Sequence, residues 1–398
     1  MKTLSKKGSV ADIIRRSIVT IVTLISVGSA ASATAGITLT RGPMILNIDW
    51  WAQLYYQSRS YTSATNSAGL SNFYFRRDRI VLSGQMTNRI GFFVDTEVPM
   101  DGQAGFNNRS MYLEDAYATF HMNSAIHFIA GKFKIPFTRE NLEDCFAPLT
   151  MDRSLVLAYT PFVSSRDTGV AMWGNLHNAM FQYRVMVSNG RQGAEQPSSK
   201  PMVTGRVTVS LLDPEYGYGY EGTYLGSMKV LTIGAAYEYQ PDVVWYNYNT
   251  RTGPKPYQAW TADIFWEQPF STGTYTLSGA YMHYSTDHAI DSAYPDPTLP
   301  QTAQLQGYYI KAGYMLPMTV GFPHARLQFF VRHEKQQYNL VTGYDDQLWN
   351  SGGFNYYIRG QSIKISGEYA HITYNNPDPT NPALQNYSQV TIELQYMF

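Results

Sequence analysis

The sequence predicts an all-β protein, a transmembrane antiparallel β-barrel of about sixteen strands. Three observations predict this fold. Segments of about ten residues that alternate apolar and polar side chains recur along the chain. Short and long connections alternate between these segments. Beyond the N-terminal region, no segment approaches the run of about eighteen apolar residues that a membrane-spanning helix needs.

Residues 1–35 have the organisation of a secretory signal peptide. Five basic residues precede an apolar run from Ile18 to Val27, and small residues follow. A helix of about ten apolar residues is too short to cross about 30 Å of hydrocarbon, which makes a single membrane anchor the weaker alternative. We expect cleavage within residues 31–35, export of the chain, and a barrel formed by residues 36–398.

The composition fits an exported barrel and excludes several other classes of protein. The 398 residues include 32 tyrosines, only 15% are charged, and Cys145 is the one cysteine, so neither an intrachain disulfide nor a thiolate zinc site is possible. The first 35 residues carry five of the 30 Lys and Arg and one of the 30 Asp and Glu, which leaves a net charge of about −4. Without a concentrated basic surface, we expect no nucleic-acid partner.

The alternation is clearest over residues 181–188, 203–211, 325–332 and 389–398. With weaker segments included, we expect strands at residues 46–57, 72–86, 89–98, 112–121, 126–136, 166–174, 178–188, 201–211, 228–240, 257–267, 274–284, 305–316, 324–334, 354–359, 361–374 and 387–398.

The connections between these strands indicate a membrane barrel rather than a soluble sandwich, which would also alternate. Short links such as Thr87-Asn88 and Gly360 alternate with long ones such as 99–111 and 137–165. Outer-membrane barrels have short turns on the periplasmic side and long loops outside. Lipid offers no partner to backbone amides, so the sheet must close. We also expect Phe398, on the last strand, to belong to a signal for outer-membrane insertion.

Motifs for catalysis or cofactor binding are weak or missing. Residues 217–222 match G-x-G-x-x-G, but alternation typical of a strand follows instead of a helix, so we expect a Gly/Tyr-rich periplasmic turn. H-E-x-x-H, G-x-S-x-G and C-x-x-C-H do not occur. We therefore expect no cofactor, no metal and no enzyme. An unrecognised hydrolase site is the alternative that assays on lipid or peptide substrates would reveal.

Several segments resemble one known family. Residues 131–137, 151–154 and 166–170 look like the runs G-x-F-K-x-P-F, M-x-R-S and R-D-x-G-V of the phosphate-selective porin O and P family. Residues 75–79 and 115–117 are similar to its F-R-R-x-R and D-A-Y. This resemblance covers residues 73–190. It implies a homotrimeric channel in the outer membrane, with sixteen strands per chain and a third long loop that folds inward to form the constriction.

The loop at 137–165 and the strands beside it carry the charged residues that we expect at the constriction. The candidate residues for the pore constriction and solute contact are Lys132, Lys134, Arg139, Glu143, Asp144, Asp152, Arg153 and Arg166. Both signs are present, and alternation places both signs on the lumen side of the other strands as well.

A lumen of mixed charge predicts weak discrimination. We therefore expect a porin through which small hydrophilic solutes or ions diffuse passively across the outer membrane. Two alternatives remain open: a channel selective for phosphate or other anions, and a structural barrel that serves as a sleeve or anchor for another protein. Single-channel conductance separates these classes, because a plugged barrel would not conduct.

Overall fold

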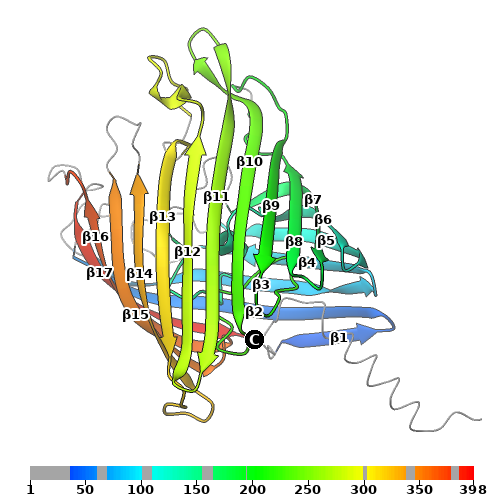
Figure 1. The fold of residues 1–398 in the computed structure, drawn as a ribbon, viewed down its shortest axis with the longest axis vertical. Coiled ribbons are helices and arrows are strands. Elements are labelled where there is room, and N and C mark those ends of the chain that lie inside the picture. The colour runs from blue at the N-terminus through cyan, green and yellow to red at the C-terminus, as the bar shows by residue number, and fades with distance from the viewer. Residues whose placement is uncertain are drawn as a thin grey trace, which may run out of the picture.

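The structure is a computed structural model and describes residues 36–60, 70–100, 110–154, 165–193, 195–298, 303–337, 346–377 and 385–398. The predicted signal peptide lies outside these residues. Sixteen antiparallel strands pair in chain order and close a barrel (Figure 1). They are β2 (Met44–Arg59), β3 (Leu70–Thr87), β4 (Ile90–Glu97), β5 (Tyr112–Asn123), β6 (Ile126–Lys134), β7 (Arg166–Leu176), β8 (Phe181–Ser188), β9 (Met202–Ser210), β10 (Val230–Asn247), β11 (Thr252–Phe270), β12 (Gly273–Ser285), β13 (Leu305–Met315), β14 (Arg326–Gln337), β15 (Gln347–Arg359), β16 (Ile363–Tyr374) and β17 (Tyr387–Met397).

The seam between β17 and β2 closes the ring. The pairing runs from Gln389 opposite Arg59 to Met397 opposite Trp51. Beyond it, the backbones of Trp50 and Phe398 exchange two hydrogen bonds of 2.9 Å each. Every strand from β2 to β17 therefore has two partners, as hydrogen bonding in lipid requires.

The sixteen predicted strands are confirmed, but several of their ends differ. Strand β10 extends to Asn247 and β11 begins at Thr252, so the connection predicted at residues 241–256 is a short turn. A further strand, β1 (Ile37–Arg41), forms a hairpin with β2 and was not predicted. Strand β15 begins at Gln347 instead of residue 354, so the predicted connection 335–353 is shorter. Glycines hid this part of the strand from the alternation pattern. A side chain at Gly353 would place its Cβ 2.1 Å from the Gly367 carbonyl of β16.

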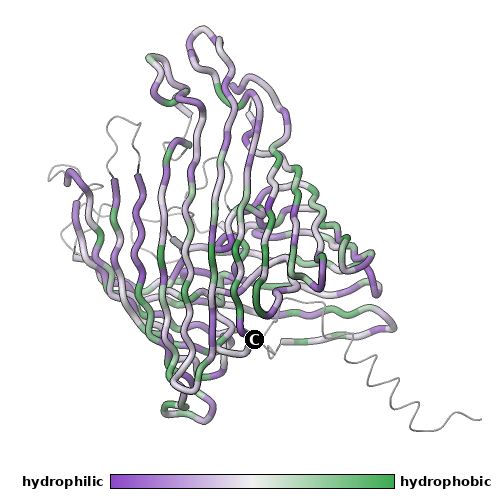
Figure 2. The backbone as a smooth tube through the Cα atoms, in the orientation of Figure 1, coloured by the Kyte–Doolittle hydropathy of each residue, from purple (hydrophilic) through white to green (hydrophobic). Residues whose placement is uncertain are grey.

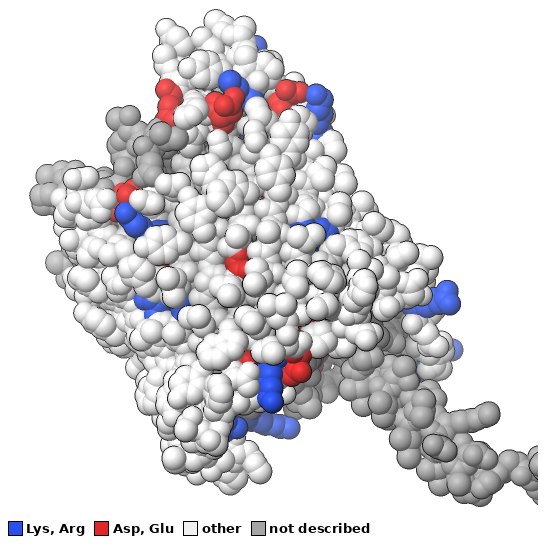
Figure 3. Space-filling model, viewed as in Figure 1, with Lys and Arg blue, Asp and Glu red and all other residues white. Residues whose placement is uncertain are grey.

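The two faces of the barrel wall differ as the alternation predicts. Apolar residues such as Val203 and Val207 are exposed on the outer face, whereas Thr204, Arg206 and Thr208 of the same strand are buried inside. The same change from hydrophobic to hydrophilic runs along the strands in Figure 2. In Figure 3 much of the outer face between the upper and lower charged groups carries few charges. Among the described residues, no helix is long and apolar enough to cross a membrane.

The core of the protein lies inside the barrel. Its largest buried apolar cluster joins Phe137 from the β6–β7 connection to wall residues that include Met186, Met282 and Tyr309. Helical structure is confined to two short pieces of the described chain, α2 (Arg139–Leu142) in that connection and η1 (Ala289–Asp291). The apolar cluster thus holds the start of the connection against one side of the wall.

Candidate pore constriction

Residues 135–154 form an inner loop that enters the lumen from the end of β6. Pro136 and the apolar residues beside it lead into α2, which begins where the side chain of Thr138 accepts a hydrogen bond of 2.9 Å from the backbone N of Asn141. Asn141 also donates to the Ile135 carbonyl at 2.7 Å. This confirms the inward third loop that the family resemblance implied.

Wall side chains bind the backbone of the inner loop on the far side of the lumen. Each donor is a polar residue of a strand distant in sequence. Gln53 donates to the Cys145 carbonyl at 3.3 Å, Gln395 to Phe146 at 2.8 Å, Asn355 to Leu149 at 2.9 Å and Tyr55 to Met151 at 3.0 Å. Because these donors come from β2, β15 and β17, the loop spans the barrel.

Ion pairs fix the same loop at both of its ends. Asp152 accepts hydrogen bonds from Arg76 at 2.6 Å and from Arg77 at 2.9 Å, both on β3. Burial alone would raise the pKa of Asp152, but these two guanidinium groups hold it well below its usual value. At the other end, Glu140 pairs with Lys311 of β13.

A second segment, residues 211–229 between β9 and β10, meets the inner loop from the short-turn end of the barrel. The backbone N of Tyr220 donates to the Leu142 carbonyl at 3.1 Å, and its carbonyl accepts from Asp144 N at 2.8 Å. Gly222 N donates to the Ala147 carbonyl at 2.9 Å. The two segments thus pair like adjacent strands inside the lumen.

This pairing corrects the prediction of a simple turn at residues 217–222. The segment does lie at the short-turn end, but it folds inward and packs against the loop. Its glycines allow this close approach, since a Cβ at Gly222 would lie 2.6 Å from the Leu149 nitrogen. The length of the connection was the signal in the sequence, because a surface turn needs only a few residues.

A buried ion pair joins the two segments. Nη1 and Nη2 of Arg139 donate to the two carboxylate oxygens of Glu215 at 2.8 and 2.7 Å. The guanidinium carbon also lies 3.8 Å from the ring centroid of Phe265 and 4.5 Å from that of Tyr220. Thr232 donates to Glu215 at 2.7 Å. Sequence reasoning missed Glu215 and Tyr220, because no local pattern links them to the loop.

Charges on the wall from β3 to β7 pair with one another as well. Arg79 lies 3.0 Å from Asp95, and its Nε donates to Glu97 at 2.7 Å. Arg166 lies 2.8 Å from Asp115. Because each cation has carboxylates beside it, the fields of these groups largely cancel at a distance.

Seven of the eight candidate residues fall into three groups. Arg139, Glu143 and Arg166 are buried by their contacts, while Asp144, Asp152 and Arg153 are half-buried on the inner loop. Lys134 is half-buried, and its Nζ donates to the Glu143 carbonyl at 2.5 Å. The structure therefore brings seven of the eight together around the loop.

Lys132 is the exception, and its predicted place in the lumen is wrong. It shares a face of β6 with the exposed residues Phe128 and Ala130. Its Nζ donates to the Leu113 carbonyl at 2.7 Å and lies 5.5 Å from the ring centroid of the exposed Tyr112. Strict alternation would place Lys134 outside too, but β6 ends at that residue and the chain turns into the lumen.

Two of the candidate cations around the loop have no carboxylate partner among the described residues. One is Lys134 and the other is Arg153, whose Nη2 donates to the Cys145 sulfur at 2.9 Å. Burial alone would raise the pKa of the Cys145 thiol, but Arg153 and Lys134 hold it well below its usual value. Positive charge is thus concentrated where the inner loop leaves β6.

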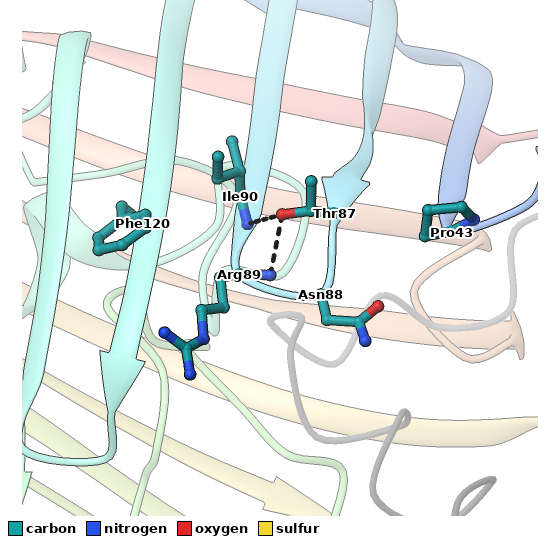
Figure 4. Close-up of a pocket in the computed structure, with 6 residues that line it drawn as sticks. All are labelled: Pro43, Thr87, Asn88, Arg89, Ile90 and Phe120. Carbon is teal, nitrogen blue, oxygen red and sulfur yellow. Dashed lines mark hydrogen bonds between the residues drawn. The ribbon is translucent and has the colours of Figure 1, made fainter.

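A groove of about 420 Å³ lies outside this constriction, at the short-turn end (Figure 4). It is lined by Pro43, Thr87, Asn88, Arg89, Ile90 and Phe120. Thr87 accepts hydrogen bonds from the backbone N of Arg89 at 3.2 Å and of Ile90 at 3.1 Å. Phe120 is on the exposed face of β5, so the groove belongs to the outer rim and not to the lumen.

Comparison with known proteins decides the family. The family model of the phosphate-selective porin O and P matches residues 52–398. The chain belongs to this family. The porin is 23% identical over 380 residues to an uncharacterized protein of Aquifex aeolicus, a match that covers 87% of this chain and 84% of that protein.

Two solved structures share the fold of this porin. The outer membrane channel DcaP of Acinetobacter baumannii superposes with a TM-score of 0.58 at 12% identity, covering 92% of this chain and all of that one. The anion-selective porin from Comamonas acidovorans gives 0.54 at 9% identity, covering 89% and 100%. Family and fold are those of an outer-membrane channel rather than of an enzyme.

Proposed function

We propose that this porin is a passive diffusion channel for small hydrophilic solutes and ions, with weak charge selectivity. The pairing of opposite charges around the inner loop supports it most directly. Arg139 with Glu215, Glu140 with Lys311 and Asp152 with Arg77 leave little net field for a passing ion. Paired charges across a narrow passage leave a transverse field, which orients dipolar solutes more than it sorts ions by sign.

The reversal potential in a salt gradient tests this proposal. We expect a small reversal potential in the unmodified porin. Replacing Lys134 and Arg153 together with Gln should shift it toward the cation value, because these two cations have no carboxylate partner. Lys132→Gln is the matched control, since Lys132 faces outward and should leave the potential unchanged. A potential near the ideal anion value, with phosphate blocking chloride current at micromolar levels, would contradict weak selectivity.

A phosphate- or anion-selective channel is the second candidate function. The same two cations favour it, because Lys134 and Arg153 lie together beside Cys145 at the constriction. The outcome of the reversal-potential experiment in the unmodified porin distinguishes the two candidates.

The pKa of Glu221 predicts a pH-dependent selectivity. Burial, followed by the negative charges of Asp144 and Glu267, raises the pKa of Glu221 to about 8. This side chain is neutral at pH 6 and carries a negative charge at pH 9. We expect the reversal potential to shift toward cations as the pH rises from 7 to 9, and the shift to be reduced in Glu221→Gln. An identical shift in that variant would show that Glu221 is not the group responsible.

We further infer export through residues 1–35, on the basis of their signal-peptide pattern, and assembly as a homotrimer in the outer membrane, which the family resemblance implies. The N-terminal sequence of the mature protein should begin near Gly36. The unboiled protein should migrate on gels as a β-rich trimer, and boiling should convert it to a monomer. A channel that never conducts would favour the remaining alternative, a structural sleeve or anchor for another protein.

A further inference from the structure

We propose that the lumen carries a saccharide-binding surface next to the constriction, an inference that rests on the proposed channel function. The surface consists of aromatic side chains from β2, β4, β5, β6, β7 and the 211–229 segment. We call it the aromatic wall. Its members, in spatial order, are Trp51, Phe93, Tyr117, Phe133, Tyr218, Trp173, His127 and His121.

The rings of the aromatic wall form an unbroken series. Successive ring centroids lie 6.4, 5.6, 6.0, 6.0, 5.8, 4.3 and 4.9 Å apart in that order. These separations are typical of aromatic pairs in contact. Phe146 of the inner loop continues the series, with its ring 5.5 Å from that of Trp51. The wall therefore begins at the constriction and runs around the barrel from β2 to β7.

Alternation along the strands places these rings on the lumen side. Trp51 is two residues from Gln53, whose amide reaches the Cys145 carbonyl of the inner loop. Phe93 is two residues from Asp95, and Tyr117 is two residues from Asp115. Both acids form ion pairs inside the barrel.

Six of the eight aromatic residues are partly exposed, whereas Phe133 and Trp173 are buried. Trp51, Phe93, Tyr117, Tyr218 and both histidines are half-buried, while Asp95 and Asp115 beside them are buried. An apolar surface that faces the water-filled side of a channel gains free energy when a solute covers it. The partial exposure of these six residues therefore points to a ligand that packs against their exposed parts.

Neutral polar residues and paired charges surround the aromatic wall. Ser83, Gln85 and Thr119 share its lumen face, and Asp49 of the same face is buried. Arg79 lies opposite Trp51 on β3, and it pairs with Asp95 and Glu97. Asp115 pairs with Arg166, so the charges beside the wall largely cancel. A neutral solute therefore suits this surface better than an ion.

A saccharide has both features that the wall can recognise. The C–H face of a sugar ring packs against aromatic rings, and its hydroxyls donate to and accept from neutral polar side chains. An aromatic solute would also stack on the rings. Its other face, however, is apolar and would be exposed to water. We therefore assign the surface to neutral oligosaccharides.

Current block by a sugar tests the assignment. In single-channel recordings, maltotriose should reduce the current, and polyethylene glycol of similar mass should reduce it less. Phe93→Ala and Tyr117→Ala should each raise the half-blocking concentration of maltotriose by about threefold to tenfold, as expected for loss of one ring contact. Phe92→Ala is the matched control, because Phe92 is the neighbour of Phe93 on the opposite face of β4 and should leave the block unchanged.

Three results would overturn the assignment. One is equal block by maltotriose and the polymer, the second is unchanged maltotriose block in both lumen variants, and the third is stronger block by benzoate than by maltotriose. Each variant must first show normal conductance without sugar, which verifies its folding. A barrel without any conductance would contradict the proposed channel function instead, whereas normal conductance without sugar block would contradict the aromatic wall alone.

Discussion

Replacing Glu215 with Ala is expected to lower the free energy of unfolding by about 3–5 kcal/mol and to make the channel current unstable. The side chains of Arg139 and Glu215 are only 1% and 2% exposed, so the change leaves a buried guanidinium without its bidentate partner. Glu143 remains 3.3 Å from Arg139 Nε but cannot replace both hydrogen bonds. The inner loop and the 211–229 segment should then separate and rejoin, which open-channel noise would record.

A matched control lies on the surface of the same protein. Glu195 pairs with Arg251, and their side chains are 46% and 59% exposed. Glu195→Ala should cost only about 0–1 kcal/mol, because solvent screens the exposed pair. The double variant Arg139→Met with Glu215→Leu should recover much of the loss from Glu215→Ala, since no unpaired charge stays buried. Equal costs for Glu215→Ala and Glu195→Ala would mean that the buried pair does not hold the segments together.

The second large effect is expected on the outer face of β9. Val207 is 60% exposed and lies near the middle of the strand, so Val207→Arg should cost about 2–4 kcal/mol of folding free energy in a bilayer. Val203 is 42% exposed and lies near the long-loop end of the same strand, where the same substitution should cost about 0–1 kcal/mol. Urea titration of porin folded into vesicles measures both values.

The comparison of Val203→Arg with Val207→Arg tests whether the loss of folding free energy depends on depth in the bilayer. Similar costs at Val203 and Val207 would mean that β9 does not cross the bilayer as its outer face indicates.

Arg206, the lumen-facing neighbour of Val207, is unsuitable as a control for this experiment. It donates to Asp263 at 2.6 and 2.7 Å and to the Phe137 carbonyl at 3.0 Å, so its loss would also loosen the inner loop.

The strands and their faces could be predicted from the sequence because both depend on local alternation. Val203, Val207 and Arg206 follow it directly, since adjacent residues of a strand must point to opposite sides. Alternation carries less information where a strand ends or where glycine replaces side chains. Lys134 enters the lumen for the first reason, and the start of β15 was missed for the second. Lys132 follows the alternation of Phe128 and Ala130 to the outer face, and the prediction was wrong because it assigned both lysines to the lumen.

The constriction was less predictable because its contacts join residues that are far apart in sequence. The charged residues of the loop could be found, but not their partners. Arg139 and Glu215 are 76 positions apart, and Glu140 and Lys311 are 171 apart. Without those partners, the sequence pattern predicts contact with the solute for charges such as Arg139. The 211–229 segment has neither strand nor helix periodicity, so only its length indicated an unusual structure.

The seam between β2 and β17 sets the order in which the protein can fold. Gln53 and Gln395 form a hydrogen bond of 2.8 Å across it although they are 342 positions apart. Contacts of such long sequence separation form slowly, because a long chain must lose its freedom before any of them is made. Until β17 arrives, both edges of the sheet remain unpaired and open to aggregation.

The inner loop depends on the same late event. Gln395 of β17 binds the Phe146 carbonyl, and Asn355 of β15 binds that of Leu149, so these loop positions have no wall to bind before the last strands join. An assembly intermediate that lacks β17 would therefore have neither a closed sheet nor an ordered constriction. Closure of the barrel and ordering of the constriction therefore occur in a single kinetic step. Conducting channels should then appear with the same rate constant as protease-resistant barrels.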